Sequence, residues 1–319
     1  MTAGSEFDWR PANQSELAAK RGRLALEAAA AGGHHLALFG RDTALRLAQR
    51  LHGLLPDLDD RTATEVAQTY RKARLRDPEA PVARRPPWQA ARSTTSVQKV
   101  TGSPTGPGAA ALAHGGLLFL DDACELADLS LRALRTVLDA GHTQGFGSHG
   151  PGFPARFQLV LASRACPVSR EHGAEPCDCT PSAVRRYRQL LAPLLDRVEM
   201  RVVLPAWTPA PAGADWLAGE STDTVAARVI QARSVAADRW ARYGLVTNAQ
   251  AATTAVHTDL AKRWAAQVAA LPARLDVQNL PYRELGQLWA VAWTLADLAG
   301  RDAPDDADLA KAISLHLAA

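Results

Sequence analysis

The sequence lacks most features of secreted, disulfide-stabilised and membrane-spanning proteins. Its 319 residues include only four cysteines, so a chain of this length does not depend on disulfide bonds. No apolar run approaches the roughly 20 residues that a helix needs to cross a bilayer. The N-terminus has none of the basic, apolar and small-residue blocks of a signal peptide. These absences predict a cytoplasmic protein without a membrane-spanning segment.

The sequence also lacks the signatures of two enzyme classes. We find no Ser-His-Asp or Cys-His pattern of a hydrolase and no glycine fingerprint of a dinucleotide-binding fold. Hydrophobic residues make up 47% of the chain and charged residues 22%, which is ordinary for a globular protein with a buried core. The length suggests one large domain or two moderate ones.

Positive charge is concentrated in one segment, although the formal net charge of the chain is only +3. A net charge this small does not indicate nucleic acid by itself. Between residues 70 and 100 eight basic residues face two acidic ones, Asp77 and Glu79, so eight minus two gives a local charge of +6. The basic residues are Arg71, Lys72, Arg74, Arg76, Arg84, Arg85, Arg92 and Lys99.

These residues form a basic insert near 70–108, and its larger part, 78–108, is rich in proline, arginine, serine and glycine. Such a composition predicts a loop or an extended insert. Arg84, Arg85 and Arg92 are its candidate contacts to the phosphates of DNA or another nucleic acid. The alternative is a solvated charge run, which is slightly favoured.

The remaining pattern predicts an α/β protein, because short apolar strands alternate with helices and this favours a parallel sheet covered on both faces. The alternation of strands and helices ends at a Pro/Ala-rich stretch near residue 207, after which only helices are predicted. We therefore expect a tail over 1–13, an α/β core over 14–206 and a helical domain over 207–319. The expected strands are 34–39, 116–120, 157–162 and 199–204. The expected helices are 15–31, 43–55, 57–76, 130–140, 182–191, 222–243, 259–271, 282–298 and 305–316.

One strand ends in two acidic residues, Asp121 and Asp122, after the run AHGGLLFL. Alone this is a weak signal. Other stretches of the chain also match motifs of a single protein family, and they occur in the family's order. They are 28–36, 154–160, 177–181, 186–188, 193–198, 219–221 and 294–300. As an ordered set, over about residues 14–316, they resemble the ComM/magnesium-chelatase family of AAA+ ATPases. The match does not include the domain that precedes this core in full-length ComM-like proteins.

The resemblance implies an AAA+ P-loop-type parallel sheet core followed by a smaller all-helical lid, with ATP and Mg²⁺ as cofactors. Asp121 matches the acid that holds Mg²⁺ in the family. Asp122 stands where the family usually has a glutamate that polarises water. Arg197 aligns with the arginine finger that reaches a neighbouring subunit, and Arg283 aligns with sensor 2. An ordinary ion pair is the alternative for both arginines.

The chain departs from the family where a P-loop, G-x-x-x-x-G-K-[ST], would cradle phosphates with backbone N–H groups. Residues 40–47 read GRDTALRL, which is about two residues short, with one glycine and no Lys-Ser/Thr pair. Its remaining candidates for nucleotide contacts are Gly40, Arg41, Thr43 and Arg46. Arg164 stands at sensor 1 in place of the family's asparagine. These departures predict weak ATP binding or none.

Three cysteines lie close together in the sequence. Cys166, Cys177 and Cys179 would form a Cys₃His zinc site with His172. The family's second cysteine is replaced by Val168, so three free thiols are the favoured interpretation and no zinc is expected.

The leading hypothesis is a pseudo-ATPase that binds protein partners, as a homo- or hetero-oligomer with AAA+ or other proteins, and donates Arg197 to a competent neighbour. The first alternative is an ATP-driven ring motor on DNA. The second is an accessory subunit for metal insertion. Both rest on analogy within the family.

Overall fold

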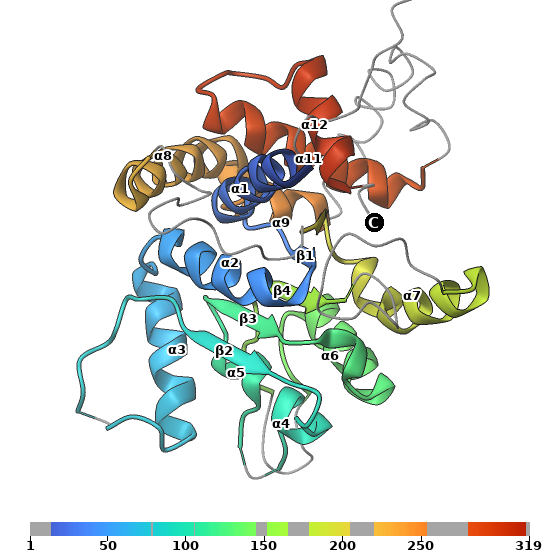
Figure 1. Ribbon diagram of the computed structural model, residues 1–319. Helices are drawn as coiled ribbons and strands as arrows, with labels where there is room; N and C mark the ends of the chain where they lie inside the picture. The colour runs from blue at the N-terminus through green and yellow to red at the C-terminus, as the bar shows by residue number, and fades with distance from the viewer. Residues whose placement is uncertain are drawn as a thin grey trace, which may run out of the picture.

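The computed structural model describes residues 14–77, 79–104, 106–144, 152–164, 179–204, 220–253 and 280–316. Five strands form one sheet in the order β2-β3-β4-β1-β5, and every pairing is parallel. The strands are β1 (Leu36–Phe39), β2 (Trp88–Ala91), β3 (Leu117–Leu120), β4 (Gln158–Ser163) and β5 (Met200–Val203). This arrangement confirms the predicted α/β class with a parallel sheet (Figure 1).

Helices cover both faces of the sheet. The longer ones are α1 (Gln14–Gly32), α2 (Arg41–Leu54), α3 (Asp60–Lys72), α6 (Asp128–Ala140), α7 (Pro181–Leu195), α8 (Thr222–Trp240), α11 (Tyr282–Leu298) and α12 (Asp306–His316). The short ones are α4 (Val97–Thr101), α5 (Ala109–Leu112) and α9 (Asn248–Thr253), with 3₁₀ turns η1 (Ala123–Glu125) and η3 (Ala241–Tyr243). Within these described residues no helix is long and apolar enough to cross a membrane.

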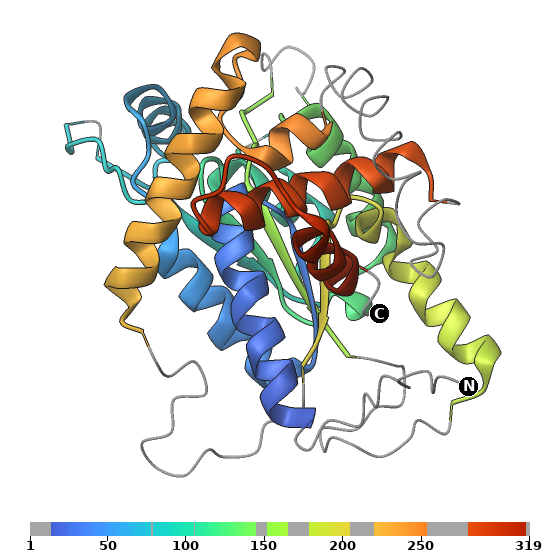
Figure 2. The same ribbon diagram turned by 90° about the horizontal axis from the view of Figure 1, so that it is seen from above.

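Alternation along each strand divides the core into two layers, because successive side chains of a strand point to opposite faces. Leu36 and Leu38 of β1 pack with α1, α2, α8, α11 and α12. Ala37 and Phe39 pack on the other side with α4, α6 and α7. Figure 2 shows α1, α8 and α11 lying over the strands. The helical part after residue 220 therefore shares its apolar core with the sheet.

Local signals explain where the helices begin and end. Asp59 accepts a bond from the Thr62 N–H at the start of α3, and Ser221 does the same for Thr224 at the start of α8. Such N-caps satisfy donors that the first helical turn leaves unpaired. Gly141 ends α6 in the left-handed conformation, which glycine adopts without steric cost.

The prediction of a loop or extended insert over 78–108 is wrong in two places, since this stretch contains strand β2 and helix α4. Strand β2 lies at the edge of the sheet and only Ala91 of its four residues is buried, so its sequence carries no clear apolar pattern. Helix α9 was also not predicted. The predicted tail over 1–13 and helix over 259–271 lie outside the described residues.

Candidate functional site

Five of the predicted site residues follow the carboxyl ends of four parallel strands, and we call this end of the sheet its carboxyl edge. Gly40 follows β1, Arg92 follows β2, Asp121 and Asp122 follow β3, and Arg164 follows β4. The register pairs Leu120 of β3 with Ala91 on one side and with Leu161 on the other. In open α/β sheets this edge is where ligands bind.

A single residue, Gly40, connects β1 to α2. Its backbone has φ 142°, a region that favours glycine. Its N–H donates to the Ser163 carbonyl at 2.9 Å, and a Cβ added there would lie 2.8 Å from the Cβ of Leu204. Helix α2 begins at the next residue, Arg41. The chain therefore passes from strand to helix without an intervening loop.

The other residues predicted to contact nucleotide lie on this helix. The side chains of Arg41 and Thr43 lie outside the described part of the structure. Arg46 is exposed on α2, more than one turn from its start. Their assignment as nucleotide contacts stays a prediction.

Each of the two acidic residues after β3 faces an arginine from a neighbouring strand. Arg92 Nε lies 3.4 Å from Asp121 Oδ2, and Arg164 Nε lies 3.7 Å from Asp122 Oδ1. The Cys124 thiol donates to the same Asp122 oxygen at 3.1 Å. Asp122 itself has φ 54° and ψ 56°, a left-handed conformation that costs a non-glycine residue about 1 kcal/mol or more.

Arg164 is held from several sides. Its guanidinium also pairs with the Glu125 carboxylate, and its backbone carbonyl accepts a bond from the Tyr187 hydroxyl at 3.0 Å. Burial alone would lower the pKa of Arg164, but Cys124, Asp122 and Glu125 raise it above its ordinary value on balance. For the Tyr187 hydroxyl the effect of burial has the opposite sign, and it raises the pKa above its ordinary value. Arg164 is therefore a fixed cation at the carboxyl end of β4.

Mg²⁺ does not fit this arrangement of donors. The ion prefers near-octahedral coordination by oxygen atoms, and the carboxylates of Asp121 and Asp122 already face guanidinium groups. No group of three or more His, Cys, Asp or Glu residues able to hold a metal occurs among the residues that the structure describes.

Arg197 lies at the opposite, amino edge of the sheet, three residues before β5 begins. Its guanidinium binds the Asp139 carboxylate through two nitrogens, with Nη2 2.7 Å from Oδ2. Arg283, the first-turn arginine of α11, lies close by. Burial and the charge of Arg197 lower the pKa of Arg283. The ion pair expected as the alternative is thus present for Arg197.

The two edges are separated by the length of the strands, roughly 13 Å for four residues. Arg197 and Arg283 therefore cannot serve the edge that carries Asp121 in their own chain. Within an oligomer, only a neighbouring copy or partner could bring such a site to them.

The predicted zinc ligands Cys166, His172 and Cys177 lie outside the described residues. Cys179 is described, two residues before α7 begins, and forms no disulfide with another described cysteine. The expectation of free thiols stays a prediction.

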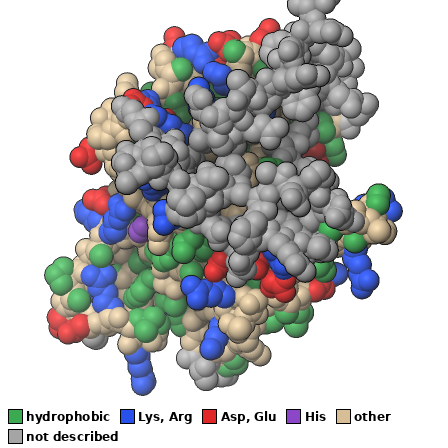
Figure 3. All heavy atoms as spheres, viewed as in Figure 1, with side chains coloured by type: hydrophobic (Ala, Val, Ile, Leu, Met, Phe, Trp, Pro, Cys, Tyr) green, Lys and Arg blue, Asp and Glu red, His purple; other side chains and the backbone are tan. Residues whose placement is uncertain are grey.

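The basic residues of 70–100 are largely bound to their own chain. Arg84 pairs with Asp60, Arg92 faces Asp121, and Arg85 Nη2 donates to the His52 carbonyl at 2.9 Å near the end of α2. On the face in Figure 3 the basic side chains are scattered among hydrophobic and acidic ones. Their role in nucleic-acid binding remains a prediction.

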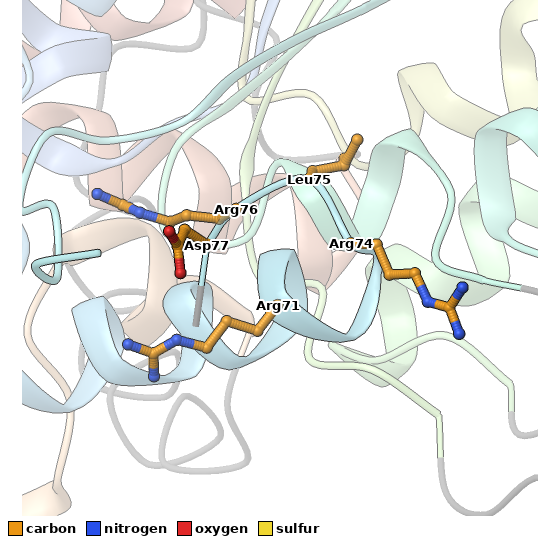
Figure 4. Close-up of a pocket in the computed structure, with 5 residues that line it drawn as sticks. All are labelled: Arg71, Arg74, Leu75, Arg76 and Asp77. Carbon is orange, nitrogen blue, oxygen red and sulfur yellow. The ribbon is translucent and has the colours of Figure 1, made fainter. Parts of the chain in front are cut away.

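The end of α3 forms a pocket of about 410 Å³ lined by Arg71, Arg74, Leu75, Arg76 and Asp77. Figure 4 shows Arg71, Arg76 and Asp77 gathered on one side, while Arg74 points away. Arg76 Nη2 also donates to the Pro81 carbonyl at 2.6 Å. The pocket is basic, but a carboxylate lies among its arginines.

Comparison with known protein families identifies the family of this chain. The family model "Magnesium chelatase, subunit ChlI" matches residues 15–211, and "Magnesium chelatase, subunit ChlI C-terminal" matches residues 219–316. The chain belongs to the magnesium chelatase ChlI family. The resemblance inferred from the motifs is therefore confirmed.

Relatives of this ChlI-family chain include proteins of three bacteria. An uncharacterised protein of Mycobacterium tuberculosis is 40% identical over 97% of this chain and 63% of its own length. The uncharacterised protein YifB of Escherichia coli is 35% identical over 67% of this chain and 43% of its own. Competence protein ComM of Haemophilus influenzae is 28% identical over 91% of this chain and 57% of its own length. The chain thus spans less than two thirds of these relatives.

A solved structure, a full-length MCM homologue from Methanopyrus kandleri, is similar to this ChlI-family chain with a TM-score of 0.44 and 16% identity. The similarity covers 92% of this chain and 53% of the homologue.

Sequence reasoning placed Asp121, Asp122 and Arg164 at this edge but missed their partners. Arg92 was assigned to nucleic acid, because β2 was not predicted and its neighbour in the sheet was unknown. Cys124 and Tyr187 were not singled out. Only the position of Cys124 two residues after Asp122 was visible in the sequence.

Proposed function

We propose that this chain is a ChlI-family AAA+ subunit that binds nucleotide weakly or not at all and acts through contacts with protein partners. The single observation that carries the proposal is the one-residue connection between β1 and α2. A phosphate cradle needs several consecutive backbone N–H groups of a loop wrapped around the anion. A lone Gly40 packed against Leu204 leaves no such loop.

The amino edge supports a role toward a neighbour. Arg197 and Arg283 lie together there with Asp139 as a shared partner. A neighbouring subunit with an intact P-loop would offer phosphate oxygens, which bind a guanidinium through two parallel hydrogen bonds as a carboxylate does. Arg197 would then exchange Asp139 for the neighbour's phosphate. In this proposal the chain lacks a nucleotide site but retains the side chains that complete one.

Calorimetric titration with ATP, with and without Mg²⁺, tests the nucleotide half of the proposal. We expect no saturable binding at micromolar concentrations, because α2 starts directly after Gly40. A matched gain-of-function variant replaces 40–43 with a complete G-x-x-x-x-G-K-T loop and should bind more tightly than the parent. Micromolar affinity of the parent for Mg·ATP with steady turnover would overturn the proposal. An ATP-driven motor on DNA would then become the better hypothesis.

Nucleic-acid binding is a second candidate, favoured by the local charge of +6 in residues 70–100. If these arginines contact phosphates, binding should weaken steeply with salt. Changing Arg84, Arg85 and Arg92 together to alanine should reduce the salt slope by roughly three, at about 0.9 per lost phosphate contact on duplex DNA. Fluorescence anisotropy at several salt concentrations measures this slope.

The control for that experiment changes Arg132, an exposed arginine paired with Asp128 on α6, to alanine. This variant should keep the salt slope of the parent. Equal binding of the triple variant and the parent would exclude these arginines from a nucleic-acid surface. Metal insertion, the remaining alternative, has no separate support in the described residues.

A further inference from the structure

We infer that two arginines of this chain replace the divalent cation at the Asp121–Asp122 pair and exclude Mg²⁺ from the carboxyl edge of the sheet. They are Arg92 and Arg164. The inference rests on the proposed loss of nucleotide binding and adds how the remaining acidic residues are neutralised.

The order of the strands places both arginines next to the acidic residues. Strand β3 lies between β2 and β4, and each of these neighbours is followed immediately by an arginine. The Asp121 N–H donates to the Ala91 carbonyl at 2.8 Å, which holds the next residue, Arg92, beside Asp121. Strand register therefore places Arg92 beside Asp121, and Arg164, directly after β4, faces Asp122 through its side chain.

The two pairs differ in strength. The Arg92 side chain is 72% exposed and meets Asp121 at the surface, where an ion pair is weak and screened by salt. Arg164 is 27% exposed, Asp122 is 13% exposed, and Glu125 provides a second carboxylate. Arg164 is thus the principal counter-ion, and Arg92 neutralises the outer carboxylate.

These pairings oppose metal binding in two ways. A divalent ion between Asp121 and Asp122 would lie within a few ångströms of two guanidinium groups, and like charges repel strongly at that distance. The thiol of Cys124 also donates to Asp122, which occupies an oxygen lone pair that a hard cation would need. Retaining the acidic residues does not preserve a metal site, because their charge is already balanced within the chain.

The experiment is a titration with Mn²⁺, a paramagnetic substitute for Mg²⁺, without nucleotide and with bound metal measured by electron paramagnetic resonance. The parent should bind no more Mn²⁺ than its Asp121→Asn variant. The double variant Arg92→Gln with Arg164→Asn should gain one saturable site, with a dissociation constant of roughly 0.1–1 mM, typical of weak carboxylate sites. Adding Asp121→Asn to the double variant should remove that site.

Charge-preserving variants are the matched controls. Arg92→Lys with Arg164→Lys keeps both positive charges and should remain without the site. Circular dichroism reports whether each variant folds. Should the double variant fail to fold, Arg92→Gln alone removes an exposed side chain and should show a weaker gain at Asp121.

Three results would overturn the inference: a Mn²⁺ site in the parent that Asp121→Asn removes, no gain in the folded variants, or an equal gain in the lysine variants. None of these results depends on ATP. The titration can therefore fail while the proposed function stands, and the reverse also holds.

Discussion

Replacing Glu199 with glutamine is expected to abolish most of the loss of stability that the parent protein suffers between about pH 6.5 and pH 8. Glu199 is 2% exposed, directly before β5, and accepts a bond from the His35 N–H at 2.8 Å. Burial raises its pKa from 4.5 to about 8, against smaller opposing effects of that hydrogen bond and of Arg283. The folded protein therefore keeps a proton that the unfolded chain releases above pH 4.5.

The sign follows from this difference in proton binding. As pH rises from 4.5 to 8 the unfolded state binds fewer protons at Glu199 than the folded state, so the free energy of unfolding falls. His34 acts in the opposite direction, because burial lowers its pKa from 6.5 to about 3. Its stabilising contribution is lost as pH falls below 6.5. His35 acts as His34 does, because burial lowers its pKa to about 4. Together the three groups give the highest stability near pH 6.5.

Urea denaturation followed by tryptophan fluorescence at pH 5.5, 7 and 8.5 measures the effect. The parent should lose about 2 kcal/mol between pH 6.5 and 8, where Glu199 alone among these groups changes stability. Glu199→Gln should show a nearly flat profile above pH 6.5, since the amide oxygen can still accept the His35 bond. The control Glu79→Gln, at an exposed position, should follow the parent. A decline of equal size in Glu199→Gln would assign the pH dependence to another group.

Gly116→Ala is expected to destabilise the protein by about 3 kcal/mol or more, the range for severe overpacking. A Cβ at Gly116 would lie 2.0 Å from the Pro87 carbonyl oxygen and 2.6 Å from the Pro87 nitrogen. Both are backbone atoms immediately before β2. Relief of the clash would separate β2 from β3 at the point where the Leu117 N–H donates to the Pro87 carbonyl at 2.9 Å.

Gly53→Ala provides the contrasting variant. Gly53 lies in α2, and a Cβ there would meet nothing within 4 Å. Alanine should therefore stabilise the helix by about 0.5–1 kcal/mol. Urea denaturation of both variants gives the comparison. A Gly116→Ala variant within about 1 kcal/mol of the parent would be incompatible with the close approach of Pro87 in the β2–β3 pairing.

The parts of the fold that sequence could predict are those with strong local signals. The apolar run before Asp121 is completely buried as β3, and the apolar alternation with helices correctly predicted a parallel sheet. Strand β2 was missed because an edge strand buries few of its residues and leaves little hydrophobic pattern.

The candidate site was predicted as a set of positions but not as a set of contacts. Arg197 binds Asp139, 58 residues away, and Tyr187 donates to the carbonyl of Arg164, 23 residues away. Such contacts depend on how α6, α7 and β4 pack against one another. The pairing of Arg92 with Asp121 depends in turn on strand register, which the sequence of either strand alone does not determine.

The shared core has a mechanical consequence for the helices after residue 220. Leu288, Val291 and Ala292 of α11 are almost completely buried in the same cluster as Leu36 and Leu38 of the sheet. Each large apolar side chain buried in this way contributes roughly 1.5–3 kcal/mol, and His34 Nε2 adds a hydrogen bond to Thr294 Oγ1 at 2.8 Å. A swing of α11 away from the strands would expose this interior to water. Helix α11 is therefore anchored to the sheet by a shared interior, and separating the two would cost the free energy of this burial.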